Sequence, residues 1–202
     1  MPKEPKHNPR TKPPELRRED LMNAAQRLFL AQGVAATAIE QITSSAGVAK
    51  GTFYLYFSSK EDVLAALGDR FAQQLLVSIK EAVAQIAATD FRQQLGTWAR
   101  ACVRGYLASI RLHNIVFYGS QSSSREDLTG NIIVDHLCGL LQRGVEAGAW
   151  SIDNPRVTAV FLYSGLHGVV DDAYTQEKQI NQKRVADRLE RLCYRAVGLP
   201  SR

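Results

Sequence analysis

Apolar residues recur along most of this chain at spacings of three and four, which is the period of an amphipathic helix. The first such stripe comprises Leu21, Ala24, Ala25, Leu28 and Phe29. Gly33 follows the stripe at the position where a helix commonly ends in a left-handed conformation. Residues 1–14 show no core-forming pattern and are rich in Lys, Arg and Pro, so we expect them to form a flexible basic arm.

Two short helical patterns come next. Thr37 and Glu40 have the spacing of a capping box, which predicts the start of a helix about two turns long. Gly47 interrupts this helix, and a second short helix is expected from about Lys50 to Tyr54. Two short helices joined by a tight glycine turn are typical of a helix-turn-helix motif.

The rest of the chain continues the helical period without a strand pattern. Ser59, with Asp62 three residues later, predicts a helix start, and Asn154 followed by Pro155 predicts another. Further helices are expected at 59–87, 91–112, 115–118, 133–148, 155–174 and 181–197. We therefore predict an all-α protein of about nine helices, with the arm at 1–14, a three-helix DNA-binding domain at 15–62 and a helical C-terminal domain at 63–202.

The two predicted domains differ in net charge. Residues 1–60 hold nine Lys/Arg against five Asp/Glu, whereas residues 61–202 hold sixteen against fifteen. Positive charge concentrated in one module favours a polyanion partner, although a basic tail that only aids solubility has the same composition. No run approaches the roughly 18 apolar residues of a membrane helix, and no signal-peptide core follows the N-terminus, so a cytoplasmic location is expected. Three widely spaced cysteines suggest buried thiols rather than disulfides.

One segment carries a specific motif. Residues 46–61 read AGVAKGTFYLYFSSKE. This segment closely resembles the recognition segment of the tetracycline-repressor (TetR) family, A-G-V-S-K-G-T-[LF]-Y-x-[YH]-F-x-[SN]-K-E, and the resemblance covers about residues 17–64. The chain departs from the family pattern at Val34, Ala38 and Thr43. Of these three, the change at Ala38 removes a hydroxyl that could contact a phosphate, and none lies in the recognition helix.

The residue types of this segment suit DNA recognition. Gly51 allows the backbone to approach the major groove closely, and Lys50 can reach the O6/N7 edge of a guanine. Thr52 offers a hydroxyl and a methyl group, while Tyr54 and Tyr56 would donate to phosphates. The matching family positions have these roles. The candidate DNA-binding residues are Thr37, Lys50, Gly51, Thr52, Tyr54, Tyr56 and Lys60.

Some of these residues also have a purely structural interpretation. Thr37 is a helix cap as readily as a phosphate contact, Tyr56 could pack under the following helix, and Lys60 could be an ordinary first-turn residue. Phe53 and Phe57 are expected in the core. The arm residues Arg10, Lys12, Arg17 and Arg18 could follow a minor groove or could form a solubilising tail.

For the C-terminal domain, the family resemblance implies a pocket for a small-molecule effector. Candidates for its lining are the aromatic and polar residues of the middle helices, although aromatic stripes are more often plain core. They are Trp98, Cys102, Tyr106, Phe117, Tyr118, His136, Phe161 and His167. His167 and Asp171 stand four residues apart, so they would share a helix face and could orient each other or a polar ligand.

The resemblance also implies a homodimer built from the last two helices of each subunit. Small residues on the penultimate helix would let a partner helix approach closely, and the last helix carries an apolar stripe. The candidate interface residues are Ser164, Gly168, Val185, Leu189, Leu192 and Ala196.

These features predict a DNA-binding transcriptional regulator, and in particular a repressor that an effector releases from an inverted-repeat operator. An enzyme that carries a helix-turn-helix is one alternative, but no nucleophile–base motif or phosphate-binding glycine loop supports it. A protein-interaction module that no longer binds DNA is the other. We expect no cofactor, and the spacing of His113, His136, Cys138 and His167 matches no metal-ligand pattern.

Overall fold

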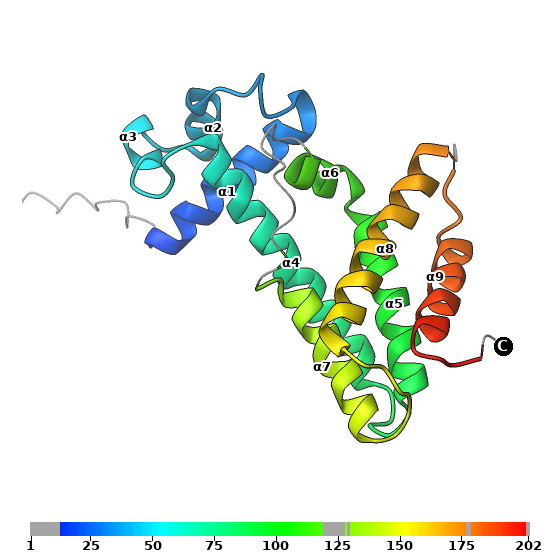
Figure 1. The fold of residues 1–202 in the computed structure, drawn as a ribbon. Coiled ribbons are helices and arrows are strands. Elements are labelled where there is room, and N and C mark those ends of the chain that lie inside the picture. The colour runs from blue at the N-terminus through cyan, green and yellow to red at the C-terminus, as the bar shows by residue number, and fades with distance from the viewer. Residues whose placement is uncertain (1–12, 119–127, 129, 177–178, 201–202) are drawn as a thin grey trace, which may run out of the picture. The chain divides into compact units, whose positions relative to one another are not determined.

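The computed structural model describes residues 13–118, 128, 130–176 and 179–200, with the side chains of Phe117 and Tyr118 left out, and every regular element within these ranges is a helix. The helices are α1 (Pro14–Gln32), α2 (Ile39–Ala46), α3 (Lys50–Phe53), α4 (Lys60–Ala84), α5 (Phe91–Ala108), α6 (Ile110–Tyr118), α7 (Ile132–Glu146), α8 (Pro155–Gln176) and α9 (Gln182–Ala196) (Figure 1). The prediction of an all-α fold is confirmed. None of the described helices is long and apolar enough to cross a membrane.

The chain divides into two compact units, Met1–Leu67 and Gly68–Arg202. The boundary lies within α4, whereas the sequence pattern suggested a boundary between residues 62 and 63, near the start of the same helix. The first unit therefore contains α1, α2, α3 and the first turns of α4. The second contains the remainder of α4 and helices α5 to α9.

Capping residues explain where several helices begin. The side chain of Asn131 accepts hydrogen bonds from the backbone N–H groups of Ile133 and Val134 at the start of α7. Asn154 accepts from Val157 at the start of α8, where Pro155 occupies the first helical position. Asn181 does the same for α9 by accepting from Arg184. Each cap satisfies N–H groups that have no partner within the helix.

The first unit is built around a small apolar core. α1 contributes Leu21, Met22, Ala24, Ala25 and Phe29 to this core, and α2 packs against α1. Ile42 is fully buried on α2, as the apolar spacing predicted. The core fixes the position of α2, which in turn carries the turn to α3.

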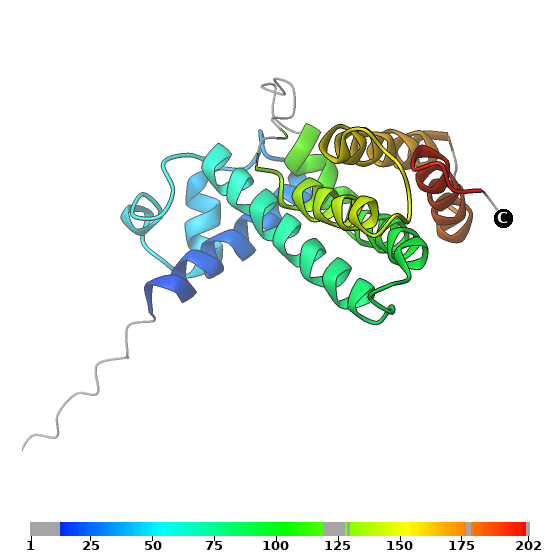
Figure 2. The ribbon, with the colours of Figure 1, turned by 60° about the horizontal axis from the view of Figure 1, so that its bottom comes forward.

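The second unit is a bundle in which α5 packs against α7, α8 and α9. Helix α8 runs beside both α7 and α9, as Figures 1 and 2 show. Trp98 and Leu95 on α5 are completely buried in its core, together with Leu137 and Leu140 on α7. These side chains form the face that the apolar period of each helix predicted.

The predicted single helix over 91–112 is wrong. Helix α5 ends at Ala108, where the N–H of Ser109 bonds back to the carbonyl of Tyr106, three residues earlier, at 3.1 Å. Helix α6 then begins at Ile110, five residues before the predicted start. The break could not be read from the sequence, because Ser109 is compatible with a helix interior and the apolar spacing continues through it. Similarly, α4 ends at Ala84, before the expected end at 87.

Candidate functional site

The turn between α2 and α3 has the geometry of a helix-turn-helix. Gly47 adopts φ +69°, a left-handed conformation that glycine reaches without steric cost. The N–H of Val48 then donates to the carbonyl of Thr43 at 3.0 Å, which closes the end of α2. Ala49 is extended, and its carbonyl accepts from Thr52 to start α3. The helix-turn-helix predicted from the sequence is thus present in the first unit.

Two buried phenylalanines hold α3 against the core of the unit. Phe53 is 0% exposed and Phe57 is 4% exposed, and their ring centroids lie 5.8 Å apart. The intervening side chains face outward, with Tyr54 52% and Leu55 77% exposed. Thr52 and Tyr56 are half-buried. This arrangement presents polar and aromatic groups from a rigidly anchored short helix.

Gly51 is exposed on this surface, and the fold itself does not require a glycine there. A Cβ atom added at Gly51 would meet no atom within 4 Å, and the residue does not adopt a positive φ. Glycine in a helix costs about 1 kcal/mol relative to alanine. The absence of a side chain at Gly51 is therefore useful only toward something outside this unit.

Lys50 forms an ion pair across the two helices. Its Nζ atom lies 2.5 Å from Oε1 of Glu40 on α2, and the two side chains are 55% and 60% exposed. The hydrogen bond from Lys50 lowers the pKa of Glu40, and the same bond raises the pKa of Lys50. Both groups are therefore charged at neutral pH. Glu40 was expected only as a capping residue, so its place beside Lys50 was not predicted.

The predicted capping box of Thr37 and Glu40 is wrong. The cap of α2 is Ala38, whose backbone N–H donates to the side chain of Gln41 at 2.8 Å. Thr37 lies one residue earlier and is 1% exposed, and its hydroxyl donates to the carbonyl of Gly33 at 2.7 Å. Because this hydroxyl is used inside the unit, we assign Thr37 a positioning role and leave it out of the proposed DNA contacts.

At the start of α4, the predicted cap is present for Ser59 but not for Asp62. The Ser59 hydroxyl accepts from the N–H of Asp62 at 3.2 Å, as expected. The carboxylate of Asp62 accepts instead from the N–H and hydroxyl of Ser58, which lowers the pKa of Asp62. These bonds fix the direction in which α4 leaves the segment after α3.

Lys60, a predicted phosphate contact, points into the loop before α2. Its ammonium group donates to the carbonyls of Val34 and Thr37, both at 2.8 Å, and to that of Ala35 at 3.4 Å. An ammonium group has three donors, and all three are used here. Lys60 therefore ties this loop to the start of α4, and we treat it as a positioning residue.

Replacing Lys60 by methionine should lower the free energy of unfolding of the full chain by about 1–2 kcal/mol, because three carbonyls lose a charged donor. Denaturant titration would measure the loss. Lys50→Met removes the same charge from an exposed site of the same unit and should change stability by less than about 0.5 kcal/mol. If Lys60→Met is as stable as the wild type and instead lowers the salt dependence of DNA binding, Lys60 is a phosphate contact.

Only part of the predicted arm can be placed. Arg10 and Lys12 lie outside the described residues, whereas Arg17 and Arg18 belong to α1, which begins at Pro14. Arg18 donates to the sulfur of Met22 at 3.2 Å and its guanidinium lies 5.1 Å from the ring centre of Phe57. The Arg18 side chain thus packs against two buried residues of the first unit, Met22 and Phe57.

The candidate effector-binding residues fall into four groups, the last of which is two histidines. Trp98, Cys102 and Tyr106 are at most 3% exposed inside the second unit. Phe161 is 67% exposed, so its assignment to a pocket lining is wrong: it lies on the surface face of α8. The side chains of Phe117 and Tyr118 lie outside the described residues.

The remaining candidates are two histidines. His136 is half-buried on α7, and burial lowers its pKa. Its Nδ1 atom and the Nε1 atom of Trp98 are buried, and each lacks a hydrogen-bond partner in the described part of the chain. Such groups are uncommon in folded proteins and are candidates for contact with a bound molecule.

His167 belongs to a group of rings in tilted and edge-to-face contact, which we call the aromatic cluster: Phe71, Tyr106, His113, Tyr163 and His167. The rings of Tyr106 and His113 lie 3.8 Å apart, and those of Tyr163 and His167 lie 4.3 Å apart. Nδ1 of His167 is 2.9 Å from the carbonyl of Tyr163. The cluster joins residues from α4, α5, α6 and α8.

Two polar groups of the aromatic cluster have a defined partner or protonation state. The Tyr106 hydroxyl donates to Oδ1 of Asp171 at 2.5 Å, a contact that the sequence did not predict. His113 is 2% exposed, and burial, with the nearby His167, lowers its pKa to about 4. The His113 imidazole is therefore neutral at physiological pH.

His113 was not among the predicted pocket residues. His113 follows Tyr106 by seven residues, a spacing that would place both on one face of a continuous helix. That signal was available in the sequence, but the break at Ser109 and the approach of α4 and α8 bring the rings together. Only tertiary packing does this.

The exposed face of α8 has an apolar and small-residue surface. Val157 is 62% exposed and Phe161 is 67% exposed, and Ser164 and Gly168 continue the same face. A Cβ atom at Gly168 would meet no atom within 4 Å. We call the exposed residues Val157, Phe161, Ser164, Gly165 and Gly168 the α8 face.

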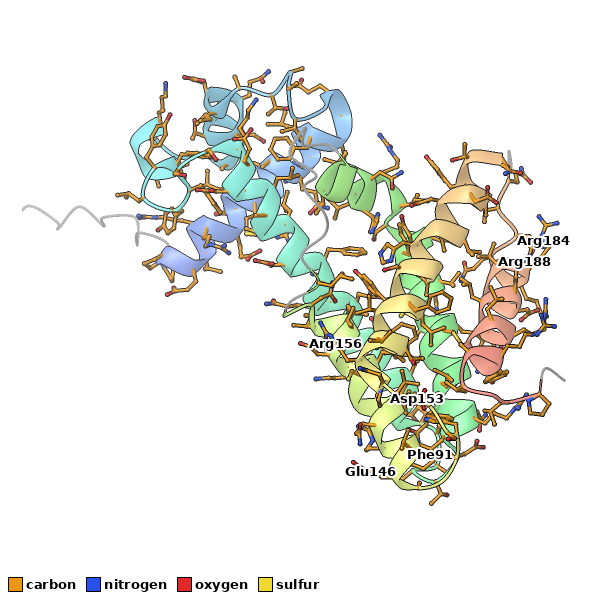
Figure 3. The ribbon with its side chains drawn as sticks, viewed as in Figure 1. Phe91, Glu146, Asp153, Arg156, Arg184 and Arg188 are labelled. Carbon is orange, nitrogen blue, oxygen red and sulfur yellow. The ribbon has the colours of Figure 1, made fainter. Side chains whose placement is uncertain are left out.

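The predicted dimer contacts on α9 need correction. Val185 and Leu189 are 4% and 3% exposed, because their stripe packs inward, where α9 lies against α5. Leu192 is 43% exposed and Ala196 is half-buried, so only these two of the α9 candidates remain near the surface. The outer surface of α9 is basic instead, with Arg184 and Arg188 pointing away from the bundle (Figure 3).

The cysteines are reduced in the structure. Cys102 and Cys193 are buried, and burial raises the pKa of Cys193 to about 12 and that of Cys102 well above its ordinary value. Both thiols are therefore protonated and poor nucleophiles. Among the described residues, no group of three or more His, Cys, Asp and Glu side chains could hold a metal ion.

Comparison with known proteins agrees with the geometry of the first unit. Residues 21–67 match the family model of the bacterial regulatory proteins of the tetR family. The chain is 33% identical over 94 residues to the HTH-type transcriptional activator FasR of Mycolicibacterium smegmatis, a match covering 46% of this chain and 40% of FasR. The chain thus spans about two fifths of the length of that relative.

Solved structures share the fold over nearly the whole chain. The fatty acid degradation regulator FadR from Bacillus halodurans has a TM-score of 0.72 at 22% identity, covering 96% of this chain and all of that one. The complex of RolR with resorcinol has a TM-score of 0.68 at 20% identity, covering 93% of this chain and 90% of that one. At such identities the likeness concerns the fold.

The fold and the first unit define an all-helical protein with an N-terminal helix-turn-helix. Its helix-turn-helix domain, residues 21–67, matches that of the tetR family of bacterial regulatory proteins.

Proposed function

We propose that this protein is a sequence-specific DNA-binding transcriptional regulator that acts as a homodimeric repressor and is released by a small-molecule effector. The observation that carries the proposal is the surface of α3, where Lys50, Gly51 and Tyr54 are all exposed. The buried Phe53 and Phe57 anchor this surface without taking part in it. A short, rigid helix with these groups fits the major groove of double-stranded DNA.

The proposed DNA contacts are of two types, those to base edges and those to the phosphate backbone. Lys50 would read a base edge, and Gly51 would let the backbone approach the groove closely. Thr52, Tyr54 and Tyr56 would contact phosphates or a thymine methyl group and so fix the register. Basic arm residues ahead of α1 could add contacts in a minor groove.

Selection of bound duplexes from random DNA by the full chain tests this function. An enriched inverted repeat, bound in gel-shift or anisotropy assays at physiological salt, is the expected result. An enzyme that merely carries the motif, or an interaction module without DNA binding, would enrich no sequence. Release of the selected duplex by candidate metabolites would then identify the effector.

Gly51→Ala separates a DNA-facing role from a structural one. We expect this variant to be as stable as the wild type or more stable by up to about 1 kcal/mol, because a Cβ atom meets nothing and alanine favours a helix. We expect its affinity for the selected duplex to fall about tenfold or more, since the added methyl group would separate α3 from the groove. Thermal melting and anisotropy titration measure the two effects.

Gly139→Ala is the matched control, because Gly139 is a helical glycine of α7, outside the α8 face, whose Cβ would make only an ordinary contact with the Arg143 side chain at 3.5 Å. It should leave the fold intact and should leave operator affinity about unchanged. Unchanged DNA affinity in Gly51→Ala would mean that α3 does not approach DNA closely.

The α8 face supports the homodimer. An exposed surface that contains Val157 and Phe161 is costly to leave in water, and small residues beside them allow a second helix to approach. Two copies related by a twofold axis would bury this face against itself, with Leu192 at its margin. A dimer in turn requires an operator with two inverted half-sites.

The aromatic cluster supports the effector site. RolR binds resorcinol, a small aromatic molecule. The rings of the aromatic cluster, which include Tyr106 and His113, would suit a ligand of this kind. Helix α4 is shared by both units, and Phe71 belongs to its second part. A ligand could change DNA affinity only if it bound one arrangement of α4 better than another.

A further inference from the structure

The ion pair between Glu40 and Lys50 joins the two helices of the helix-turn-helix. Glu40 lies in the first turn of α2 and Lys50 is the first residue of α3. Their charged atoms are 2.5 Å apart, and both side chains are more than half exposed. The pair therefore presents a carboxylate and an ammonium group side by side on the surface that carries Gly51.

Stability does not account for this pair. Ion pairs between exposed side chains contribute between 0 and about 1 kcal/mol, because water and salt screen them. A carboxylate on a DNA-facing surface also repels phosphates, which works against binding. The position of Glu40 thus has a cost for a DNA-binding protein unless the carboxylate itself recognises something.

We propose that Glu40 and Lys50 act together as one reader of a G·C base pair in the major groove. Lys50 donates to the O6 and N7 atoms of the guanine, and Glu40 accepts from the N4 amino group of its cytosine. Guanine O6 and cytosine N4 are neighbours on the edge of the same base pair, just as the ammonium and carboxylate groups are neighbours on the protein. This inference rests on the proposed DNA-binding function and assigns a new specificity residue to it.

The carboxylate is what separates G·C from A·T. A lysine alone can donate to the N7 atom of either purine, so it distinguishes guanine from adenine poorly. In an A·T pair, the N6 amino group of adenine takes the place of guanine O6, and thymine O4 takes the place of cytosine N4 and, as an acceptor, repels the carboxylate. Glu40 therefore converts a contact that accepts either purine into one that requires G·C over A·T.

The carboxylate should also weaken binding to DNA of other sequences. At an A·T pair, Glu40 meets an acceptor instead of an amino group, and Lys50 is then the only partner of a carboxylate that lies near the phosphates. Removing it should raise nonspecific affinity and lower specific affinity, so that the ratio of the two falls. A residue that only held the lysine in place would not produce opposite changes.

The test uses the full chain and the duplex it selects from random DNA. In the wild type, replacing one G·C pair of each half-site by A·T should weaken binding about tenfold or more, and Lys50→Ala should identify that pair by losing this dependence. Glu40→Ala should reduce the G·C to A·T ratio to about twofold or less. Glu40→Gln keeps a neutral acceptor and should retain part of the ratio.

Duplexes with modified bases show which base atoms Glu40 and Lys50 contact. A duplex with N4-methylcytosine at that pair lacks the amino proton in the groove, and should weaken the wild type while leaving Glu40→Ala unchanged. A duplex with 7-deazaguanine should weaken both, because Lys50 remains in each. Glu61→Ala, which removes a carboxylate from the exposed first turn of α4, is the matched control and should leave the ratio intact.

Melting temperatures should be equal for wild type and Glu40→Ala, which separates recognition from folding. An unchanged G·C to A·T ratio in Glu40→Ala would overturn the proposal, with the DNA-binding function still standing. Equal gains of affinity for all duplexes would overturn it too, since Glu40 would then act only by repulsion. If the wild type enriches no duplex, the DNA-binding function fails, and this inference fails with it.

Discussion

Replacing Phe161 by glutamate should convert the protein from a dimer to a monomer and reduce operator affinity about a hundredfold or more. Phe161 is 67% exposed on the α8 face, so the substitution leaves the fold of each unit intact. In a dimer, the same position would bury two carboxylates against an apolar surface, which costs several kcal/mol. A loss of about 2.7 kcal/mol already corresponds to a hundredfold change in affinity.

Light scattering at micromolar concentration and anisotropy titration would measure both effects. Val77→Glu is the matched control. Val77 is also an exposed apolar residue of the second unit, at 54%, but it lies on α4 and outside the α8 face. It should remain dimeric and bind normally. A dimeric Phe161→Glu variant with normal operator affinity would show that the subunits meet elsewhere.

His113 should make the protein sensitive to acid. Its pKa is about 4 in the folded chain, below the 6.5 of an exposed histidine, because burial disfavours the charged imidazole. The unfolded chain therefore binds the proton more readily between these values, and stability falls as pH falls through this range. From about pH 7.5 to about pH 5, this group alone should remove about 2 kcal/mol of unfolding free energy.

Denaturant titrations of wild type and His113→Phe at the two pH values measure this effect. Phenylalanine keeps a ring beside Tyr106 but cannot be protonated, so its loss of stability in acid should be smaller. The neighbouring His167 and Asp171 remain in both proteins, and so does His136, whose pKa is also lowered by burial. Equal losses in the two proteins would show that His113 is not the sensitive group.

Local sequence signals predicted much of the first unit. Gly47 must end α2 because a left-handed turn is needed there, and Ser59 provides the hydroxyl that starts α4. The burial of Phe53 and Phe57 followed from their spacing within the recognition segment. Such features depend on residues a few positions apart, and short-range hydrogen bonds and helical periodicity determine them.

Contacts between distant residues could not be predicted in the same way. Lys60 looked like a surface cation, but its ammonium group reaches carbonyls more than twenty residues earlier in the chain. Glu40 looked like a capping residue, but the turn at Gly47 brings it against Lys50. A side chain's partner depends on where the backbone returns in space, which periodicity does not encode.

The second unit shows the same division between local pattern and tertiary structure. Helical spacing predicted where α8 and α9 lie along the chain, but it could not determine which neighbour each apolar stripe meets. Packing against α5 buried Val185 and Leu189, and it left Phe161 in solvent. The sequence by itself thus determined the helical class of the fold, most of its helices and the helix-turn-helix motif. Only the tertiary structure decided which of their faces are core and which are free to bind, because burial depends on all the helices at once.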